Sequence, residues 1–498
     1  MKMPLPVAER AGIEYHHSMT DSMSSPLPEI ASYLRRDKHA RKVEVPKIGD
    51  LPTELREAAQ RLPLLTGTWN PVEIYTAEPK TLQEEKQTFL EAYRRGRAYQ
   101  PRLTYDMADT FDLGDARAVL ETMLATVRAC KTTERGMKLV KLMLHHKIRD
   151  DLATYDLVDG IQRKDEALIG NALQYKYPGV DPLILALAER DFRHRTDHAS
   201  DEEKTDPGLL TPEQKTYLRE LQFDAEGVRE AFEWALEQYG ILRTDAGGSG
   251  YRVEVDPRAT AIDVRDKSVR GPTVFVPERT RESGERLLGL IAHEIEGHAR
   301  QSWNGERLFM FGGGPLKIDE ETLYEGLAMR YENEFRSTWF GTEYESRNLD
   351  YYVFAVRAAE TGSTFHEVFC DQVEKRLRVL LRIPEHTSFD PARVRGTPEE
   401  DHALRAAWGT TYRTMRGHTD MANPERFAMA KDLAYFRGYM LDRQLRESGH
   451  GHINEAAICS IGQLRMLAEF QIREDHLPIS FQNVTERRLK MMLARMPA

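Results

Sequence analysis

The chain has 498 residues, of which 40% are hydrophobic and 30% are charged, and its formal net charge is −10. These values are ordinary for a globular protein with a large core. The acidic balance argues against a general nucleic-acid or anionic-membrane binder, so we expect neither a nucleic acid nor a membrane as a partner.

The cysteines and the first residues of the chain bear on its compartment. Cys130, Cys370 and Cys459 are far apart, odd in number and form no C-x-x-C pair, which indicates reduced thiols. The N-terminus contains no apolar stretch typical of a secretory signal, and no apolar run approaches the length of a membrane span. We therefore expect a cytoplasmic protein.

The first half of the chain is expected to be mainly helical. Residues 1–55 are rich in proline, serine and charge without a sustained period, which predicts a partly disordered extension. Residues 56–240 have helical periodicity. Thr211-Pro212 followed by Gln214 predicts a capped helix start. An apolar face that ends before Gly240 predicts a second helix in this part, formed by Val228, Phe232, Ala235, Leu236 and Tyr239.

The periodicity changes after residue 240. Residues 251–255, 261–264 and 273–276 alternate in polarity, which predicts a small antiparallel sheet leading directly into the next helix. The remainder of the chain has helical periodicity again. We therefore expect a predominantly helical α+β protein in three parts, namely an extension (1–55), a helical part (56–240) and a core with a helical C-terminal part (241–498).

The helix after the sheet carries the pattern H-E-x-x-x-H, formed by His293, Glu294 and His298. Imidazole nitrogens are common zinc ligands, and a glutamate beside the first histidine can act as a general base. We expect Thr280 to cap this helix, with Glu282 in its first turn.

The five-residue spacing of the histidines leaves two interpretations. On a regular helix they lie about 140° apart, and His298 falls on the apolar stripe of Leu287, Ile291 and Ile295. Either the helix contains a π-type distortion and His298 binds a metal, or the helix is regular and His298 is a core residue. We predict the distorted helix.

A third ligand is available in a second helix, predicted over residues 321–332, with Glu321, Glu325 and Glu332 near one face. One carboxylate from this helix completes a site of two histidines and one glutamate with an open position for water. We expect Glu321 and Glu332 to belong to a solvated helix face.

HEIEGH at 293–298 followed by YEGLA at 324–328 resembles the family of microtubule-associated tyrosine carboxypeptidases, whose bacterial members are labelled by a QEGLA motif and as flavohemoglobin expression-modulating. The resemblance covers about residues 55–485. Tyr324 departs from the family, which commonly has an acidic residue or glutamine there. Three further segments are similar to the family's: NPVEIYTAEP at 70–79, TYRTMRG at 411–417 and KDLAYFRG at 431–438.

The resemblance implies a zinc metallopeptidase core with one Zn²⁺ per chain, held by His293, His298 and Glu325, with Glu294 as catalytic base. It implies carboxypeptidase action on the C-terminus of a peptide or protein, with aromatic terminal residues in the characterised eukaryotic relatives.

The late segments supply further candidates by the same match. Lys431 and Tyr435, and also Arg416, are candidates for stabilising the tetrahedral oxyanion. Arg416 and Arg413 are candidates for binding the terminal carboxylate, and we choose Arg416 because it precedes Gly417.

Two other functions remain open. Dipeptidyl peptidases also carry H-E-x-x-x-H, but they require paired acidic residues at the third ligand, which Tyr324-Glu325 lacks. A zinc-binding regulatory protein without catalysis has no need of a base, so the presence of Glu294 favours an enzyme.

Overall fold

A computed structural model of the protein describes residues 46, 48–66, 77–105, 113–197, 208–243, 249–257, 259, 261–265, 271–309, 322–341, 349–447, 449–456, 475 and 477–496. Almost all of the expected N-terminal extension, most of the 70–79 segment, Glu321 and Cys459 lie outside the described residues. Cys130 is buried and Cys370 is half-buried, and both are free thiols.

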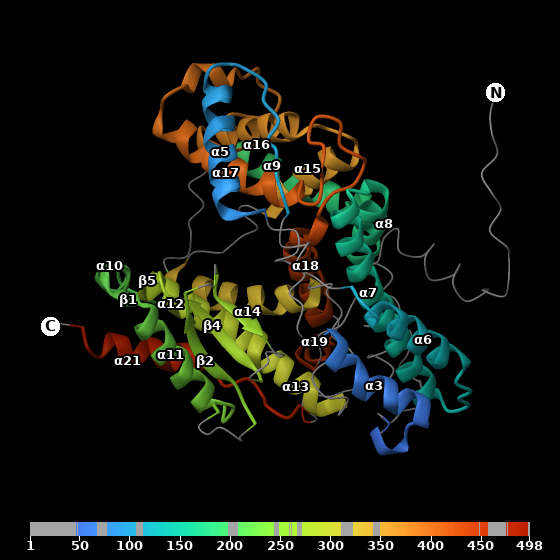
Figure 1. Ribbon diagram of the computed structural model, residues 1–498. Helices are drawn as coiled ribbons and strands as arrows, with labels where there is room; N and C mark the ends of the chain where they lie inside the picture. The colour runs from blue at the N-terminus through green and yellow to red at the C-terminus, as the bar shows by residue number, and fades with distance from the viewer. Residues whose placement is uncertain are drawn as a thin grey trace, which may run out of the picture.

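The described residues are mostly helical, as the sequence predicts (Figure 1). The helices before the sheet are η2 (Ile48–Asp50), α3 (Thr53–Thr66), α5 (Pro79–Arg94), α6 (Ala116–Ala129), α7 (Arg135–Arg163), α8 (Glu166–Lys176), α9 (Pro182–Asp197), α10 (Pro212–Glu220) and α11 (Ala225–Gln238). The strands are β1 (Gln222–Asp224), β2 (Arg252–Asp256), β3 (Asp263–Arg265), β4 (Thr273–Pro277) and β5 (Arg281–Ser283). The helices after the strands are α12 (Gly284–Leu290), η4 (Ile291–Ala299), α13 (Arg300–Phe309), α14 (Thr322–Phe340), α15 (Leu349–Glu360), α16 (Phe365–Leu380), η5 (Pro391–Val394), α17 (Pro398–Thr414), η6 (Ala430–Asp432), α18 (Leu433–Glu447), α19 (Gly451–Ala456) and α21 (Val484–Leu493).

The two helix predictions before the sheet are confirmed. Thr211 and Gln214 form both hydrogen bonds of a capping box at the start of α10. The predicted apolar face of α11 is buried. Gly240 has a φ of +67°, the left-handed conformation in which glycine ends helices at little cost.

The sheet is mixed, and the prediction of an antiparallel sheet is wrong in this respect. Its strand order is β2-β4-β3; β2 runs parallel to β4, and β3 runs antiparallel to β4. The reason lies in β4, whose sequence TVFVP is apolar on both faces and is largely buried. A strand that is buried on both faces is typical of parallel pairing and belongs in the centre of a sheet, where β4 pairs with β2 on one side and with β3 on the other.

The helix that carries the histidines begins later than predicted. Ser283, and not Thr280, is its N-cap, and the Ser283 hydroxyl accepts a hydrogen bond from the Arg286 amide at 3.2 Å. Glu282 lies in strand β5, opposite Phe223 of β1. The pairing of β5 with β1 keeps residues 281–283 extended, so the first helical turn forms only from residue 284 onward.

The described hydrophobic residues form three buried clusters. The largest joins helices from residues 51–188 with helices from residues 349–477. The second places α11 and the sheet against Ile291, Ile295 and Ala299 of η4, and the third packs α10, α12 and α21 against α14. The helices η4 and α14 therefore lie where the second and third clusters meet, and α18 passes beside α14 in the middle of the molecule (Figure 1).

Small residues allow η4, α14 and α18 to approach closely. A β-carbon on Gly297 of η4 would lie 2.6 Å from the α-carbon of Ala328 of α14. A β-carbon on Gly326 of α14 would lie 2.3 Å from the carbonyl carbon of Gly438 of α18. Both neighbours are backbone atoms, which cannot move aside as a flexible side chain can, so glycine is required at both positions.

None of the helices in the described part of the chain combines the length and the apolar character that crossing a lipid bilayer demands.

The helix contact at Gly326 predicts a specific loss of stability. Gly326→Ala should destabilise the protein by about 1–3 kcal/mol, because the added methyl group forces α14 and α18 apart. Gly409→Ala is the matched control: this glycine also lies within a helix, but its β-carbon would meet nothing within 4 Å. The control should keep or raise stability by up to about 1 kcal/mol. The measurement is the midpoint of denaturant unfolding, and equal stability of the two variants would contradict this account of the packing.

Candidate metal centre

The H-E-x-x-x-H segment forms a π-helix, as predicted from its spacing. The π-helix η4 covers Ile291–Ala299 and continues directly from α12 into α13. A π-helix bonds residues five apart, so it brings His293 and His298 onto one face where a regular helix would separate them. The apolar stripe of Leu287, Ile291 and Ile295 is buried on another side, in the second cluster.

Three side chains converge on one point between η4 and α14. His293, His298 and Glu325 each offer an atom that can bind a metal ion, and these atoms all lie within 4.8 Å of one another. Glu325 Oε2 lies 3.5 Å from His293 Nε2 and 3.6 Å from His298 Nε2. The two imidazole rings are almost perpendicular, at 88°.

Two of the three separations among these atoms are close to those of a tetrahedral metal site. Zinc with bonds of about 2.0–2.1 Å to nitrogen and oxygen separates two neighbouring ligand atoms by about 3.4 Å. The two separations at Glu325 are close to that value, and they are too long for hydrogen bonds. Glu325 Oε2 is buried and accepts no hydrogen bond from a described residue. The buried carboxylate oxygen and the two imidazole nitrogens together are a suitable donor set for a divalent cation.

The charges of the three groups depend on one another. Burial alone would lower the pKa of His293, but Glu325 and Glu332 outweigh it and raise this pKa well above its ordinary value. Burial would likewise raise the pKa of Glu325, but His298 and His293 hold it well below its usual range. A divalent cation bound by these residues competes with the proton of His293, because a metal ligand must be deprotonated.

Glu294 is buried beside the three groups without belonging to them. Burial raises its pKa to about 8; the imidazole of His293 opposes this rise, and the carboxylates of Glu325, Asp263 and Glu332 add to it. A bound dication would favour the ionised carboxylate and so act in the opposite direction. A carboxyl group whose pKa lies near neutrality can both accept and donate a proton, which is what general acid–base catalysis requires.

Glu332 is buried, and the prediction that it belongs to a solvated helix face is wrong. Its Oε2 lies 3.2 Å from His293 Nδ1, although the imidazole is not turned to form a straight hydrogen bond. Burial would raise the pKa of Glu332, but His293, Arg286 and Arg336 outweigh burial and lower it to about 2. The sequence did carry a signal, because Glu332 follows Glu325 by two helical turns on the same face.

Tyr324 packs directly on the second histidine. Its ring stacks on His298 with a centroid distance of 3.6 Å and an interplanar angle of 21°. This stacking restricts the rotation of the His298 imidazole.

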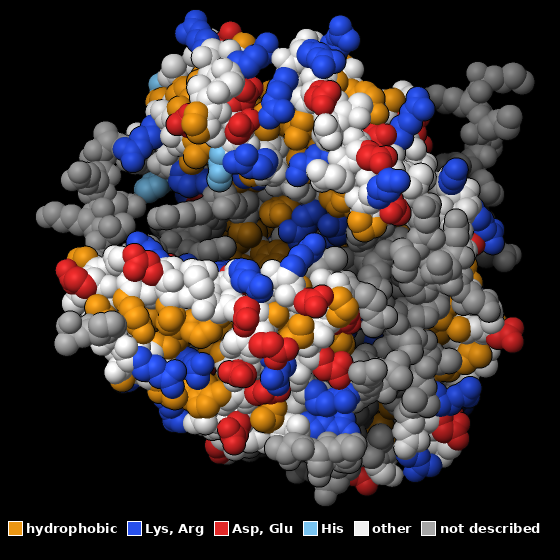
Figure 2. Space-filling model, turned by 60° about the vertical axis from the view of Figure 1, so that its left-hand side comes forward, with side chains coloured by type: hydrophobic (Ala, Val, Ile, Leu, Met, Phe, Trp, Pro, Cys, Tyr) orange, Lys and Arg blue, Asp and Glu red, His pale blue; other side chains and the backbone are white. Residues whose placement is uncertain are grey.

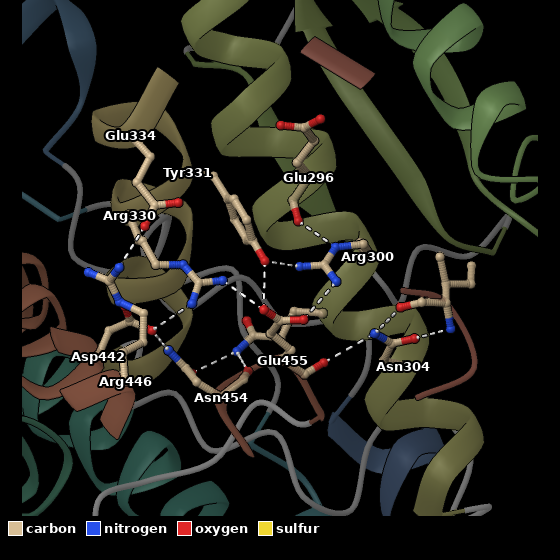
Figure 3. A network of polar contacts seen from close by, with 12 residues as sticks. Glu296, Arg300, Asn304, Arg330, Tyr331, Glu334, Asp442, Arg446, Asn454 and Glu455 are labelled. Carbon is tan, nitrogen blue, oxygen red and sulfur yellow. Dashed lines mark hydrogen bonds and ion pairs between the residues drawn. The ribbon is translucent and has the colours of Figure 1, made fainter. Parts of the chain in front are cut away.

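A buried polar network lies behind the site and joins η4 and α13 to α14, α18 and α19 (Figure 3). The carboxylate of Glu455 accepts hydrogen bonds from Arg300, Arg330 and Tyr331 at 3.1, 2.8 and 2.8 Å. The Arg300 side chain is completely buried, and its Nε donates to the backbone carbonyl of Glu296 within the π-helix. Through Arg300 and Glu455 the network connects the end of the π-helix to α14 and α19.

The 431–438 segment adjoins the third ligand. Lys431 lies in η6, and Tyr435 lies in α18, one turn before the glycine that packs against Gly326. Both side chains are partly buried. The structure therefore brings the backbone of this segment beside the helix that carries Glu325.

The two candidate arginines differ in their partners. Arg413 forms an ion pair with Asp432 at 2.8 Å and donates a hydrogen bond to the Tyr352 hydroxyl at 3.1 Å. Arg416 lies over the ring of Tyr412, 5.0 Å from its centroid, and no carboxylate among the described residues pairs with it. None of the described contacts of Arg416 is with a metal ligand.

Segments far apart in the sequence meet near these arginines. The amide of Ala77, in the described end of the 70–79 segment, donates a hydrogen bond to the Tyr412 hydroxyl at 2.9 Å. Arg413 then links α17 to η6, which leads into α18. Figure 2 shows a hollow between the upper group of helices and the sheet-containing part below, with hydrophobic, lysine and arginine side chains on its floor.

Compared with known proteins, the chain matches no family model and no curated protein sequence.

The donor set predicts the metal content of the protein. After loading with zinc and dialysis, elemental analysis should give about one zinc per chain, held by three protein ligands. Glu325→Ala should lose most of it, because two histidines alone bind a dication weakly. The matched control is Glu334→Ala, which removes an exposed carboxylate from the same helix and should leave zinc unchanged. Full occupancy in Glu325→Ala would show that Glu325 is not a ligand.

Proposed function

We propose that this chain is a zinc-dependent metallopeptidase that removes residues from the C-terminus of peptides or proteins. The observation that carries the proposal is that a cluster of side chains able to bind a metal ion lies beside a separate carboxyl group able to act as a base. His293, His298 and Glu325 bring three atoms that can bind a metal ion within 4.8 Å of one another, and the buried carboxyl of Glu294 lies beside this group without belonging to it. A purely structural zinc site closes its fourth position and needs no base.

The residues divide the chemistry among them. His293, His298 and Glu325 would hold the zinc, which supplies Lewis acidity toward water and toward the carbonyl oxygen of a peptide bond. Glu294 accepts a proton from the attacking water and returns it to the leaving amine. Tyr435 and Lys431 are the candidates for stabilising the oxyanion, since their segment adjoins the helix of Glu325.

Carboxypeptidase action requires a group that binds the terminal carboxylate of the substrate. Arginine suits this task, because its guanidinium forms two parallel hydrogen bonds with a carboxylate. We assign this role to Arg416 in preference to Arg413, which already binds Asp432. The described contact of the Arg416 guanidinium is with the ring of Tyr412, and no carboxylate among the described residues pairs with it.

The role of Glu294 has a direct test. Glu294→Gln should keep the zinc and the fold and lower turnover by a factor of about 10² or more, because the amide cannot accept the proton. The assay is cleavage of a peptide mixture read by mass spectrometry, with and without a chelator, and the control is Glu278→Gln, an exposed carboxylate in a turn. Single residues lost from the C-terminus support the proposal. Loss of N-terminal dipeptides would indicate a dipeptidyl peptidase, and no cleavage would indicate a zinc-binding protein without this activity.

The role of Arg416 predicts a preference for free carboxylates. A peptide amidated at its C-terminus should be cleaved about 30–150-fold less efficiently than its free-acid twin, which corresponds to about 2–3 kcal/mol for a charge-assisted contact. Arg416→Ala should remove most of this preference and keep the zinc, whereas Arg405→Ala, an exposed arginine on the neighbouring helix α17, should retain it. Equal cleavage of both peptides by the unmodified protein would exclude a carboxypeptidase.

A further inference from the structure

Glu332 faces the metal centre from the same helix as the third ligand. It follows Glu325 by seven residues in α14, which is about two turns, so both carboxylates lie on the side of α14 that meets η4. Only 6% of its surface is exposed. A buried carboxylate is costly unless its oxygens are paired, so the partners of Glu332 indicate what it does.

The two oxygens of Glu332 have different partners. Oε1 accepts hydrogen bonds from Arg286 Nη1 at 3.0 Å and from Arg336 Nε at 3.1 Å. Oε2 lies 3.2 Å from His293 Nδ1. The two arginines therefore hold the carboxylate in place from one side, while its other oxygen faces the imidazole.

This arrangement sets the orientation of the first ligand. His293 Nε2 faces Glu325, so the opposite ring nitrogen, Nδ1, is the one that faces Glu332. We infer that Glu332 is a positioning residue, which keeps the proton of His293 on Nδ1 and directs Nε2 at the metal. The inference rests on the proposed zinc site. The ring torsion of histidine is soft, so the small turn that straightens the Nδ1–H···Oε2 contact is cheap.

The surroundings of Glu332 are built to keep it there. Arg336 also lies 3.5 Å from Glu285, so the ion pair continues from α14 to α12. Gly289 of α12 leaves the space for this pair, because a β-carbon there would lie 3.2 Å from both Arg336 Nη2 and Glu332 Oε1. Side chains from two helices, Arg286 of α12 and Arg336 of α14, thus hold the carboxylate.

A simpler role for Glu332 is an ion pair that only stabilises the packing of α12 against α14. The two roles differ in one respect. If Glu332 only forms an ion pair, removing Glu332 or removing its arginine partner has the same effect. If Glu332 positions His293, zinc binding is weakened only when the Glu332 carboxylate itself is removed. Arg286 supplies the comparison, because it binds Oε1, has no contact with His293 among the described residues, and is partly exposed.

The experiment measures the zinc dissociation constant of the full-length protein by competition with a chromophoric chelator. Glu332→Gln should weaken zinc binding by about 10–100-fold, the usual effect of removing a partner of a ligating histidine. Arg286→Gln should weaken it by less than about 3-fold, while lowering the unfolding midpoint of the metal-free protein about as much as Glu332→Gln does. Replacement of zinc by Co²⁺ adds a spectroscopic readout, and the visible absorption should change in Glu332→Gln only.

The outcomes separate this inference from the proposed function. Equal zinc affinity of Glu332→Gln and the unmodified protein would overturn it, as would equal weakening in Glu332→Gln and Arg286→Gln. If Glu332→Gln fails to fold, Glu332→Asp is the second variant. It keeps a negative charge near the arginines, but its side chain is one methylene shorter, so the carboxylate lies further from His293. We expect this variant to bind zinc several-fold more weakly than the unmodified protein. If the zinc affinities of the variants differ as predicted but the unmodified protein cleaves no peptide, the inference is supported and the proposed peptidase activity is refuted. A protein that binds no zinc refutes both.

Discussion

The proposed metal centre depends on the backbone contacts among three helices. Gly297 meets Ala328, and Gly326 meets Gly438, so η4, α14 and α18 pack without side chains between them. The ligands are sequence neighbours of these contacts: His298 follows Gly297, and Glu325 precedes Gly326. A ligand that lies next to a backbone contact has little freedom to move, because the position of its α-carbon is set by the packing. The EGLA segment can be understood in this way, with glutamate as ligand, and glycine and alanine as the points of close approach.

The π-helix is a less favourable conformation than an α-helix, so the surroundings of η4 must hold it in place. Two features do so. The apolar stripe of η4 packs against the sheet and α11 on one side. The network around Glu455 fixes Arg300 at the end of η4 and connects it to Arg330 and Tyr331 of α14. Conformations of this kind are concentrated at functional sites, where the geometry that they provide cannot be obtained from a regular helix.

Much of the site could be predicted from the sequence, because the relevant signals are local. The spacing of His293 and His298 alone requires a distortion if both bind one metal, and Glu325 lies in the next predicted helix with a suitable face. The unpredicted features depend on contacts between distant segments. Glu332 resembles a surface glutamate until α12 supplies Arg286 and the packing of η4 supplies His293. Ser283 becomes the N-cap because β5 pairs with β1, and the strand order places β4 in the centre. The family resemblance added the late segments, but their side chains could be related to the site only through the contact of Gly438 with Gly326.

The contact between Gly326 and Gly438 also has a consequence for the order in which the protein assembles during synthesis. All three proposed ligands have left the ribosome once residue 325 has emerged, but α18, against which the helix of Glu325 packs, is more than a hundred residues further along the chain. Contacts between residues so far apart form late, since the intervening chain must first be ordered. A nascent chain thus carries the three proposed ligands before it has the structure that brings them together. If the chain binds zinc as proposed, loading is in this sense a late event of biosynthesis, and a chain interrupted before α18 retains the proposed ligands but lacks the scaffold.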